Sequence, residues 1–219
     1  MSPRRSLHDN ITRLVLLTEA VYERSVTECL AHWERRRHKR PPLLIASLAR
    51  LPKSSVLLDL GCGSGRDAAD LKRRGYRVVG IDRTAALLAY ARRRAAALFL
   101  IRADLRHLPV RPGTIDGIWA AASLMHLPKS AARQVLVACH RLVRPDGLLA
   151  ATVTHGLRSR VVTTGWVPGR YFARWTKEEF ARDVERAGWR IVTLEIVHNR
   201  ERKGRWLNLV AKKEREGRG

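Results

Sequence analysis

The chain has 219 residues, of which 45% are hydrophobic, which suits one domain with a substantial core and is short for two. No apolar run reaches the roughly 18 residues that cross a bilayer, and the three cysteines form no CxxC pair. These features disfavour a membrane span, a zinc site and a disulfide framework. Lysine and arginine number 43 against 20 acidic residues, and the resulting formal charge of +23 would attract polyanions such as RNA.

The chain opens with helical spacing of its apolar residues. This spacing predicts a helix over 7–37, and Pro41 and Pro42 then precede a short amphipathic helix at 42–52. From there, short apolar runs alternate with longer helical segments. In chain order the remaining predicted elements are strand 55–61, helix 66–74, strand 76–82, helix 84–97, strand 98–104, strand 114–123, helix 129–143, strand 147–155, helix 176–187, strand 190–198 and strand 205–213.

Strands that alternate with helices indicate a parallel sheet with helices on both faces. Only "NRERKG" connects the last two strands, which is too short for a parallel crossover and predicts an antiparallel hairpin. We therefore expect an α/β, Rossmann-like doubly wound sheet that is mostly parallel and carries a C-terminal antiparallel hairpin strand. The expected organisation is an N-terminal helical extension at 1–50 that covers a ligand pocket, and one domain at 51–215. In this domain, 155–175 is an inserted substrate cover.

A glycine-rich turn follows the first predicted strand in "VLLDLGCGSGRDAADL". Gly61, Gly63 and Gly65 stand at alternate positions before a helix, where free backbone N–H groups and the helix dipole favour an anionic ligand group. Dinucleotide-binding turns carry GxGxxG, whereas this turn reads GxGxG and continues with Arg66. The turn therefore indicates a site for a phosphate or a carboxylate, and it disfavours a nucleotide-dependent oxidoreductase.

Acidic residues stand at the ends of the first three predicted strands. Asp59 lies just before the glycine turn, where a carboxylate suits an ammonium or sulfonium better than a pyrophosphate. Asp82 ends the second strand, where an acid can accept both hydroxyls of a ribose, and Asp104 ends the third, where it can accept the amine of an adenine. Each acid alone could simply cap the following helix. The three together favour one ligand that carries all of these groups, S-adenosylmethionine.

In its central motifs the sequence resembles the class I SAM-dependent methyltransferases. The resemblance covers roughly 42–213 and is carried by "VLLDLGCGSGRDAADL", "GYRVVGIDRT", "LIRADLRHLPV", "GTIDGIWAAASLMHLP" and "HRLVRPDGLLAATV". Small bacterial members also carry the late "GRYF" found here at 169–172. The resemblance implies an enzyme that uses S-adenosylmethionine and needs no metal. The residues it implies at the cofactor are Asp59, Gly61, Gly63 and Gly65 at the methionyl part, Asp82 at the ribose, Asp104 and Leu105 around the adenine, Ala120 and Ala121 beneath the methyl group, and with them Cys62 and Arg83.

His126, just after the fourth predicted strand, is the candidate catalytic residue. A histidine titrates near neutral pH, so at the place where methyl group and acceptor meet it could serve as a general base. It could equally hydrogen-bond a backbone group and orient its loop. The acceptor is expected between residues 1–40 and the insertion at 155–175, which both combine aromatic and basic side chains. The candidate substrate residues are Tyr22, Arg170 and Tyr171, with Arg170 foremost because the resembling enzymes carry it too.

The leading hypothesis is methyl transfer to a small-molecule acceptor by in-line displacement. An RNA methyltransferase is the alternative that the +23 charge supports, and a non-catalytic binding protein with the same fold is another. Amino methylation of nucleobases is disfavoured because "AAAS" stands where such enzymes carry a proline-rich element, and carbon-five methylation of pyrimidines because no cysteine is placed as a nucleophile. We expect a cytoplasmic protein. The acceptor, the attacked atom and the oligomeric state stay open.

Overall fold

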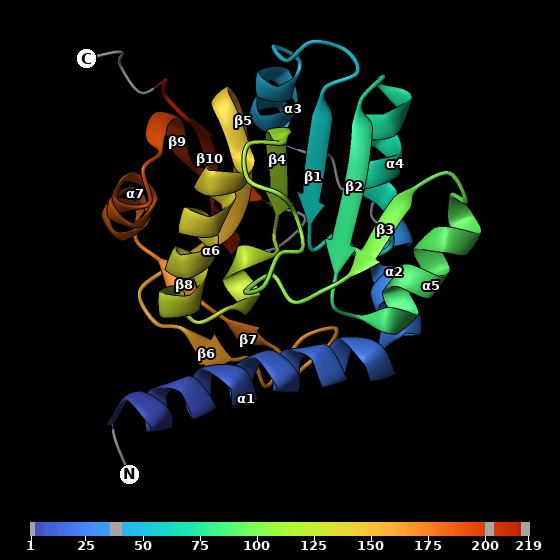
Figure 1. The fold of residues 1–219 in the computed structure, drawn as a ribbon. Helices are drawn as coiled ribbons and strands as arrows, with labels where there is room; N and C mark the ends of the chain where they lie inside the picture. The colour runs from blue at the N-terminus through green and yellow to red at the C-terminus, as the bar shows by residue number, and fades with distance from the viewer. Residues whose placement is uncertain (1–2, 36–40, 200–203, 216–219) are drawn as a thin grey trace.

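The computed structural model describes residues 3–35, 41–199 and 204–215, which form one main sheet with helices on both faces (Figure 1). The main sheet has eight strands in the order β3-β2-β1-β4-β5-β10-β9, and β8 pairs beside β5. A separate two-stranded sheet joins β6 and β7. The strands are β1 (Val56–Leu60), β2 (Arg77–Asp82), β3 (Phe99–Arg102), β4 (Ile115–Ala121), β5 (Val143–His155), β6 (Arg160–Val161), β7 (Tyr171–Phe172), β8 (Arg174–Trp175), β9 (Arg190–Asn199) and β10 (Gly204–Lys212).

The pairing of the strands confirms the predicted doubly wound sheet. β1 runs parallel to β2 on one side and to β4 on the other, and β4 runs parallel to β5. The hairpin partner β10 runs antiparallel to both β9 and β5. The last strand of the chain is therefore inserted between two earlier ones. Because β1 lies at the centre, its carboxyl end is where a ligand is expected in this kind of sheet.

Helices cover both faces of the sheet, as predicted. Buried residues of α3 and α4 pack on one face around Trp119, and those of α6 and α7 pack on the other around Ile118. Trp119 and Ile118 are neighbours on β4, so their opposite faces follow from the period of two in a strand. The helices are α1 (Pro3–Arg24), α2 (Val26–Arg35), α3 (Pro42–Leu48), α4 (Arg66–Arg73), α5 (Ala85–Arg94), α6 (Lys129–Leu142) and α7 (Lys177–Arg186), with a 3₁₀ turn at Leu124–His126.

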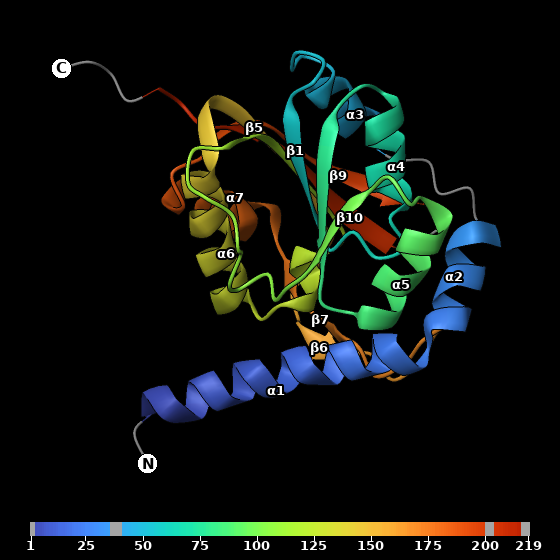
Figure 2. The same cartoon turned by 45° about the vertical axis from the view of Figure 1, so that its right-hand side comes forward.

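The N-terminal region differs from its prediction. A single helix over 7–37 is wrong, because the chain turns at Ser25 between α1 and α2. Positions 36–37 lie outside the described residues. Val21 and Cys29 pack on either side of this break against Val167, a contact that local sequence spacing does not contain. As a result α1 runs beneath the carboxyl ends of the strands, and α2 turns up beside α5 (Figure 2).

The segment at 155–175 also contains more structure than predicted. Its strands β6, β7 and β8 have only two residues each, too short to show a period in the sequence. β6 and β7 lie next to α1 in both ribbon views (Figures 1 and 2). The carbonyl of Met125 accepts a hydrogen bond of 2.7 Å from the amide of Ala173, which ties the segment to the 3₁₀ turn. The insertion is thus a packed element rather than a free loop.

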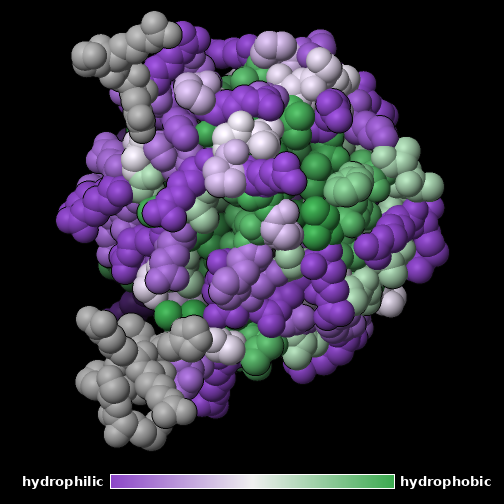
Figure 3. Space-filling model, in the orientation of Figure 1, coloured by the Kyte–Doolittle hydropathy of each residue, from purple (hydrophilic) through white to green (hydrophobic). Residues whose placement is uncertain are grey.

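One face of the molecule is mainly hydrophilic (Figure 3). Figure 3 shows charged and polar side chains over most of one face, with apolar surface gathered to the right of its centre. Within the described ranges, no helix combines the length and apolar character that crossing a membrane requires.

Candidate active site

A pocket of about 530 Å³ opens at the carboxyl ends of β1, β2 and β4, and α1, α2 and the 165–172 segment close it from outside. Its volume is ordinary for a small-molecule or cofactor site. Most of the residues singled out in the sequence meet here, although they come from elements far apart in the chain. Those that line the pocket are Tyr22, Asp59, Gly61, Cys62, Gly63, Asp82, Arg83, Asp104, Leu105, Ala121, His126 and Arg170.

Three predicted site residues, Gly65, Ala120 and Tyr171, do not line the pocket. Ala120 is fully buried in the core, because it points to the face of β4 opposite to its neighbour Ala121. Tyr171 also packs into the core, and only its backbone carbonyl reaches the site. Gly65 stands directly before α4 with φ +71°, and a Cβ there would lie 3.0 Å from Ala91. A glycine at position 65 is therefore explained by the close packing of the start of α4 against α5.

The glycine turn is held open by its own geometry. Gly61 and Gly63 have φ values of +71° and +53°, which side chains rarely adopt. A Cβ on Gly61 would lie 2.5 Å from the Cβ of Ser123, so the turn and the end of β4 approach too closely for any side chain. A Cβ on Gly63 would instead point to the ring of Trp33 at 3.7 Å. The turn is therefore a backbone-lined cradle with an indole ring from α2 above it.

Two carboxylates adjoin the cradle, that of Asp59, which is buried, and that of Asp82, which is partly exposed. Asp59 is 2% exposed at the end of β1. Asp82 accepts hydrogen bonds of 2.8 Å from the amides of Gly63 and Thr84, which joins the turn to the end of β2. Burial raises the pKa of Asp82, and the backbone hydrogen bonds oppose that rise. Carboxylate oxygens thus line the pocket on the side where the first two parallel strands end.

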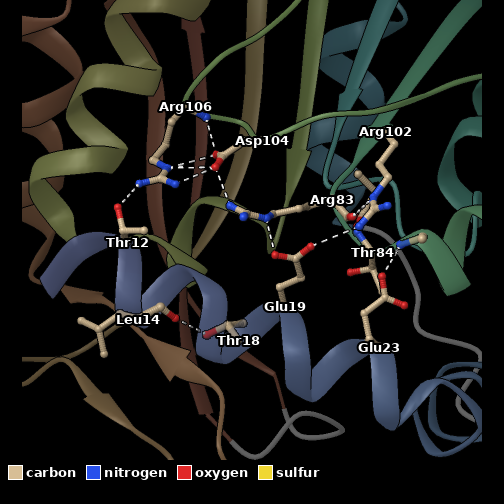
Figure 4. Close-up of polar contacts among 12 residues, drawn as sticks. Thr12, Leu14, Thr18, Glu19, Glu23, Arg83, Thr84, Arg102, Asp104 and Arg106 are labelled. Atoms are coloured by element: carbon tan, nitrogen blue, oxygen red, sulfur yellow. Dashed lines mark hydrogen bonds and ion pairs between the residues drawn. The ribbon is translucent and has the colours of Figure 1, made fainter. Parts of the chain in front are cut away.

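Asp104 is held in a cluster of charges rather than facing the pocket alone (Figure 4). Arg106 donates to both of its oxygens, with the shortest contact 2.8 Å, and Arg83 also donates to it. Burial raises the pKa of Asp104, but the bonds from Arg106 and the charge of Arg83 outweigh it, and the net pKa is lowered. The arginines occupy the oxygens that the sequence assigned to an adenine amine.

The same cluster fastens α1 over the pocket. Glu19 of α1 pairs with Arg83 and lies 3.6 Å from Arg102, and Arg106 donates to the hydroxyl of Thr12 at 3.1 Å (Figure 4). Glu23 accepts from the first amides of α5, where the helix dipole favours a negative charge. We call these contacts the α1 latch. Helix α1 is therefore attached to the ends of β2 and β3 through acidic side chains.

A chain of hydrogen bonds surrounds His126. Its Nδ1 lies 2.9 Å from the carbonyl oxygen of Tyr171, which can only accept, so Nδ1 carries the proton. Nε2 is then the acceptor for the hydroxyl of Tyr22 at 2.9 Å, and Arg170 donates to that same hydroxyl oxygen at 3.1 Å. Burial, aided by the charge of Arg170, lowers the pKa of His126 to about 4. His126 is therefore neutral near pH 7, and its Nε2 is hydrogen-bonded to Tyr22, which also lines the pocket.

Sequence reasoning missed two residues of this site. Ser123 is 7% exposed, lines the pocket, and its Oγ has no hydrogen-bond partner among the described residues. Glu19 shares one face of α1 with other lining residues. The lining residues of α1 are Val15, Thr18, Glu19 and Tyr22. Their spacing of three and four is the helical period, so this pattern could have identified Glu19 beside Tyr22.

Thiol and metal chemistry find little support in the described ranges. Cys29, Cys62 and Cys139 are buried free thiols, and burial raises the pKa of each. No group of three or more His, Cys, Asp or Glu side chains suited to a metal ion is present there.

Comparison with known proteins decides the family. A family model described as "Methyltransferase domain" matches residues 57–147. The ubiquinone biosynthesis O-methyltransferase of Methylobacterium sp. (strain 4-46) is 32% identical over 194 residues, which is 78% of this chain and 72% of that protein. The chain belongs to the SAM-dependent methyltransferases. This methyltransferase is also 28% identical to the malonyl-[acyl-carrier protein] O-methyltransferase of Salmonella typhimurium, over 78% of this chain and 67% of that protein.

Other relatives are matched over less of their length. The malonyl-[acyl-carrier protein] O-methyltransferase of Enterobacter lignolyticus is 31% identical, but the match covers 49% of this chain and only 43% of that relative. Among solved structures, the 1,6-didemethyltoxoflavin-N1-methyltransferase of Burkholderia thailandensis, with S-adenosylhomocysteine bound, superimposes with a TM-score of 0.73. It covers 98% of this methyltransferase and 92% of that chain at 22% identity, which supports the fold.

The pocket of this methyltransferase fits the family's cofactor, S-adenosylmethionine. Gly63 has space in front of it, because a Cβ there would meet only the ring of Trp33 at 3.7 Å, whereas Gly61 lies directly against Ser123. The orphaned Oγ of Ser123 needs a polar partner from a ligand. Asp59 and Asp82 offer acceptors to an ammonium and to ribose hydroxyls.

Proposed function

We propose that this chain transfers the methyl group of S-adenosylmethionine to a small-molecule acceptor. The observation that carries the proposal is that one pocket joins the glycine cradle and its acids to a second group of polar residues, Tyr22, His126 and Arg170. The first group suits the cofactor, and the second suits an acceptor. Relatives named as methyltransferases of ubiquinone biosynthesis and of malonyl-[acyl-carrier protein] support transfer to an oxygen atom.

In this proposal the cradle and the strand ends bind the cofactor. The methionyl part lies along the turn at Gly61 and Gly63, with Asp59 and Ser123 beside its ammonium, and its carboxylate needs other donors because the amides of these two glycines donate to Ile81 and Asp82. Asp82 accepts the ribose hydroxyls, with Leu105 against the adenine ring. When bound, the cofactor supplies an activated methyl group on sulfur. Catalysis by the protein then rests on positioning and on the exclusion of water by α1, α2 and the 155–175 segment.

Tyr22 and His126 can together remove a proton from the acceptor. An acceptor hydroxyl placed against Tyr22 can give its proton to the phenol oxygen while Tyr22 passes its own proton to Nε2 of His126. The acceptor oxygen is left with an electron pair for attack. The pKa of about 4 leaves the imidazole of His126 without a proton at ordinary pH, and it also makes the ring a weak base that would hold the proton only while the methyl group is transferred.

We also propose the division of the chain into an N-terminal extension at 1–50 and a catalytic domain at 51–215. The position of α1 and α2 at the mouth of the pocket supports this division. The proposed role of 155–175 as a substrate cover is supported by Trp166, Arg170 and Phe172, which line the pocket from that segment.

Gly61→Ala tests the cofactor site, with Gly113→Ala as the matched control. Gly113 has a similar φ of +65°, but a Cβ there meets nothing within 4 Å, whereas at Gly61 it meets Ser123 at 2.5 Å. Each change should cost about 1 kcal/mol through the left-handed φ. Only Gly61→Ala should weaken the binding of S-adenosylhomocysteine, by about tenfold or more, in isothermal titration calorimetry. Asp82→Ala is expected to weaken it as well.

The acceptor is sought with a labelled methyl donor. Cell extract is separated into small-molecule and RNA fractions, incubated with deuterated S-adenosylmethionine, and analysed by mass spectrometry. We expect label in the small-molecule fraction, abolished by Asp82→Ala. If Gly61→Ala, Gly113→Ala and Asp82→Ala all bound S-adenosylhomocysteine as tightly as the wild type, the proposed cofactor site would be contradicted. Cofactor binding without labelled product would favour a non-catalytic binding protein.

RNA is the second candidate acceptor. The charge of +23 favours it, and so does a relative named tRNA (carboxymethyluridine(34)-5-O)-methyltransferase from Macaca fascicularis, which is 33% identical over 58% of this chain and 18% of its own. The pocket argues for a smaller acceptor, because α1, α2 and the 155–175 segment surround it.

A further inference from the structure

Arg170 is a buried cation at the acceptor end of the pocket. Its side chain is 5% exposed and lines the same pocket as the glycine cradle. Its Nε donates to the carbonyl of Val167 at 2.9 Å, and its Nη1 donates to the hydroxyl of Tyr22 at 3.1 Å. Its guanidinium carbon lies over three aromatic rings. The rings are those of Trp166 at 4.2 Å, Phe172 at 5.2 Å and Tyr22 at 5.4 Å from the ring centroids.

This arginine differs from the other arginines that line the pocket. Arg66 lies 3.6 Å from the carboxylate of Asp67, and Arg83 pairs with Glu19 and Asp104. Across the residues that the structure describes, Arg170 forms no ion pair with an acid, and its Nη2 has no hydrogen-bond acceptor. A buried charge without a counter-ion is unfavourable, and the aromatic rings offset only part of this cost. The guanidinium of Arg170 therefore lacks a counter-ion among the described side chains.

We propose that Arg170 binds a carboxylate group of the methyl acceptor, an inference that rests on the proposed function. Nη2 and the second hydrogen of Nη1, whose other hydrogen goes to Tyr22, are donors that can meet the two oxygens of a carboxylate. One unpaired cation balances one negative charge, which favours a carboxylate over a phosphate dianion. The ring faces of Trp166 and Phe172 beside the guanidinium suit an acceptor whose body is planar and apolar.

The geometry also explains how the acceptor would be oriented. Arg170 touches the hydroxyl of Tyr22, and Tyr22 touches His126. A carboxylate on Arg170 therefore anchors the acceptor within reach of the group that removes its proton. Arg170 acts in this scheme as a binding residue that sets which molecules are accepted.

The test uses benzoate as probe and benzamide as its neutral match. Protein saturated with S-adenosylhomocysteine is titrated calorimetrically with sodium benzoate, benzamide and inorganic phosphate. We expect the wild type to bind benzoate at least about tenfold tighter than benzamide or phosphate. Arg170→Gln should abolish that preference, and Arg170→Lys should keep part of it because a cation remains. The control Arg158→Gln, in an exposed position of the same segment, should keep all of it.

The outcomes separate this inference from the proposed function. Arg170→Gln should bind S-adenosylhomocysteine within about twofold of the wild type, which also shows that the variant is folded. Equal binding of benzoate and benzamide, or unchanged benzoate binding by Arg170→Gln, overturns the proposal, and tighter binding of phosphate overturns the choice of carboxylate. If S-adenosylhomocysteine binds to none of the proteins, the proposed function fails, and the benzoate comparison is then made on the protein alone.

Discussion

His126 shows how one residue is defined by its neighbours. Its Nδ1–H bond to the carbonyl of Tyr171 fixes the tautomer, and the hydroxyl of Tyr22 then meets Nε2. Both readings made from the sequence, a base and an orienting residue, describe part of this arrangement. The bond to Tyr171 orients the ring, and the bond to Tyr22 is the route by which the proposed base would reach an acceptor.

Stability should depend on pH through His126. Its pKa is about 4 in the folded protein against 6.5 for a free histidine, so between these values the unfolded chain binds the extra proton. The contribution is therefore complete above about pH 6.5 and is lost as the pH falls toward 4. From pH 7.5 to pH 5, urea unfolding should show a loss of about 2 kcal/mol in the wild type that His126→Gln lacks. The exposed His198→Gln should behave like the wild type, and a similar loss in all three proteins would contradict the assignment.

That the residues of the proposed cofactor side meet in one pocket could be predicted from their residue types. Glycines at a strand-to-helix turn and acids at successive strand ends have few other reasons to occur together. Ala120 and Ala121 show the limit of this reasoning. Both are alanine and adjacent on β4, so nothing in their identity says which one faces the core. For Tyr171 the useful group is a carbonyl, which every residue has.

At the scale of elements, the α1 latch joins a helix to the pocket that it covers. Glu19 connects α1 to Arg83 and Arg102 at the ends of β2 and β3. Since α1 also supplies Tyr22, the latch holds this proposed acceptor residue in place relative to the ends of β2 and β3.

Removing the charge of Glu19 should loosen α1. In Glu19→Gln the ion pairs are lost, so amide hydrogen exchange within α1 should quicken several-fold, and S-adenosylhomocysteine should bind a few-fold more weakly at low salt. Raising the salt should bring the wild type closer to the variant, because these pairs are partly solvated. Glu28→Gln on the exposed side of α2 is the control. Identical exchange in α1 of all three proteins would show that the latch does not hold the helix.

The elements themselves were mostly predicted, and the exceptions share one cause. The strands and the helices of the sheet follow from clear periods in the sequence. The break at Ser25 and the short strands in 155–175 depend on contacts between distant segments, such as Cys29 with Val167. Local patterns do not contain such contacts, so these features could not be derived from them.

At the scale of the whole molecule, the positive charge and the pocket are separate features. The +23 is spread along the chain, and most arginines near the pocket are paired with acids, as Arg83 and Arg106 are. Attraction to RNA and modification of RNA are therefore separate properties. The first needs only surface charge, whereas the second needs a nucleotide inside the pocket.

The salt dependence of RNA binding should distinguish attraction to RNA from modification of RNA. We expect tRNA to bind in filter assays at low salt and to be released steeply between about 50 and 200 mM salt, with no labelled methyl group transferred to it. Asp82→Ala should bind tRNA as the wild type does, because a carboxylate inside the pocket contributes little to the outer surface. Transfer of label to tRNA in the wild type and not in Asp82→Ala would instead make RNA the acceptor.

The position of β10 in the sheet affects how the chain can fold while it is synthesised on the ribosome. β10 fills the gap between β5 and β9, yet it is synthesised after both of them. Until residues 204–212 leave the exit tunnel, β5 has no neighbour on that side and its backbone groups remain open to pairing with other chains. During this interval the nascent chain carries an incomplete sheet with an unpaired strand edge, which makes it prone to aggregation and a target for chaperones.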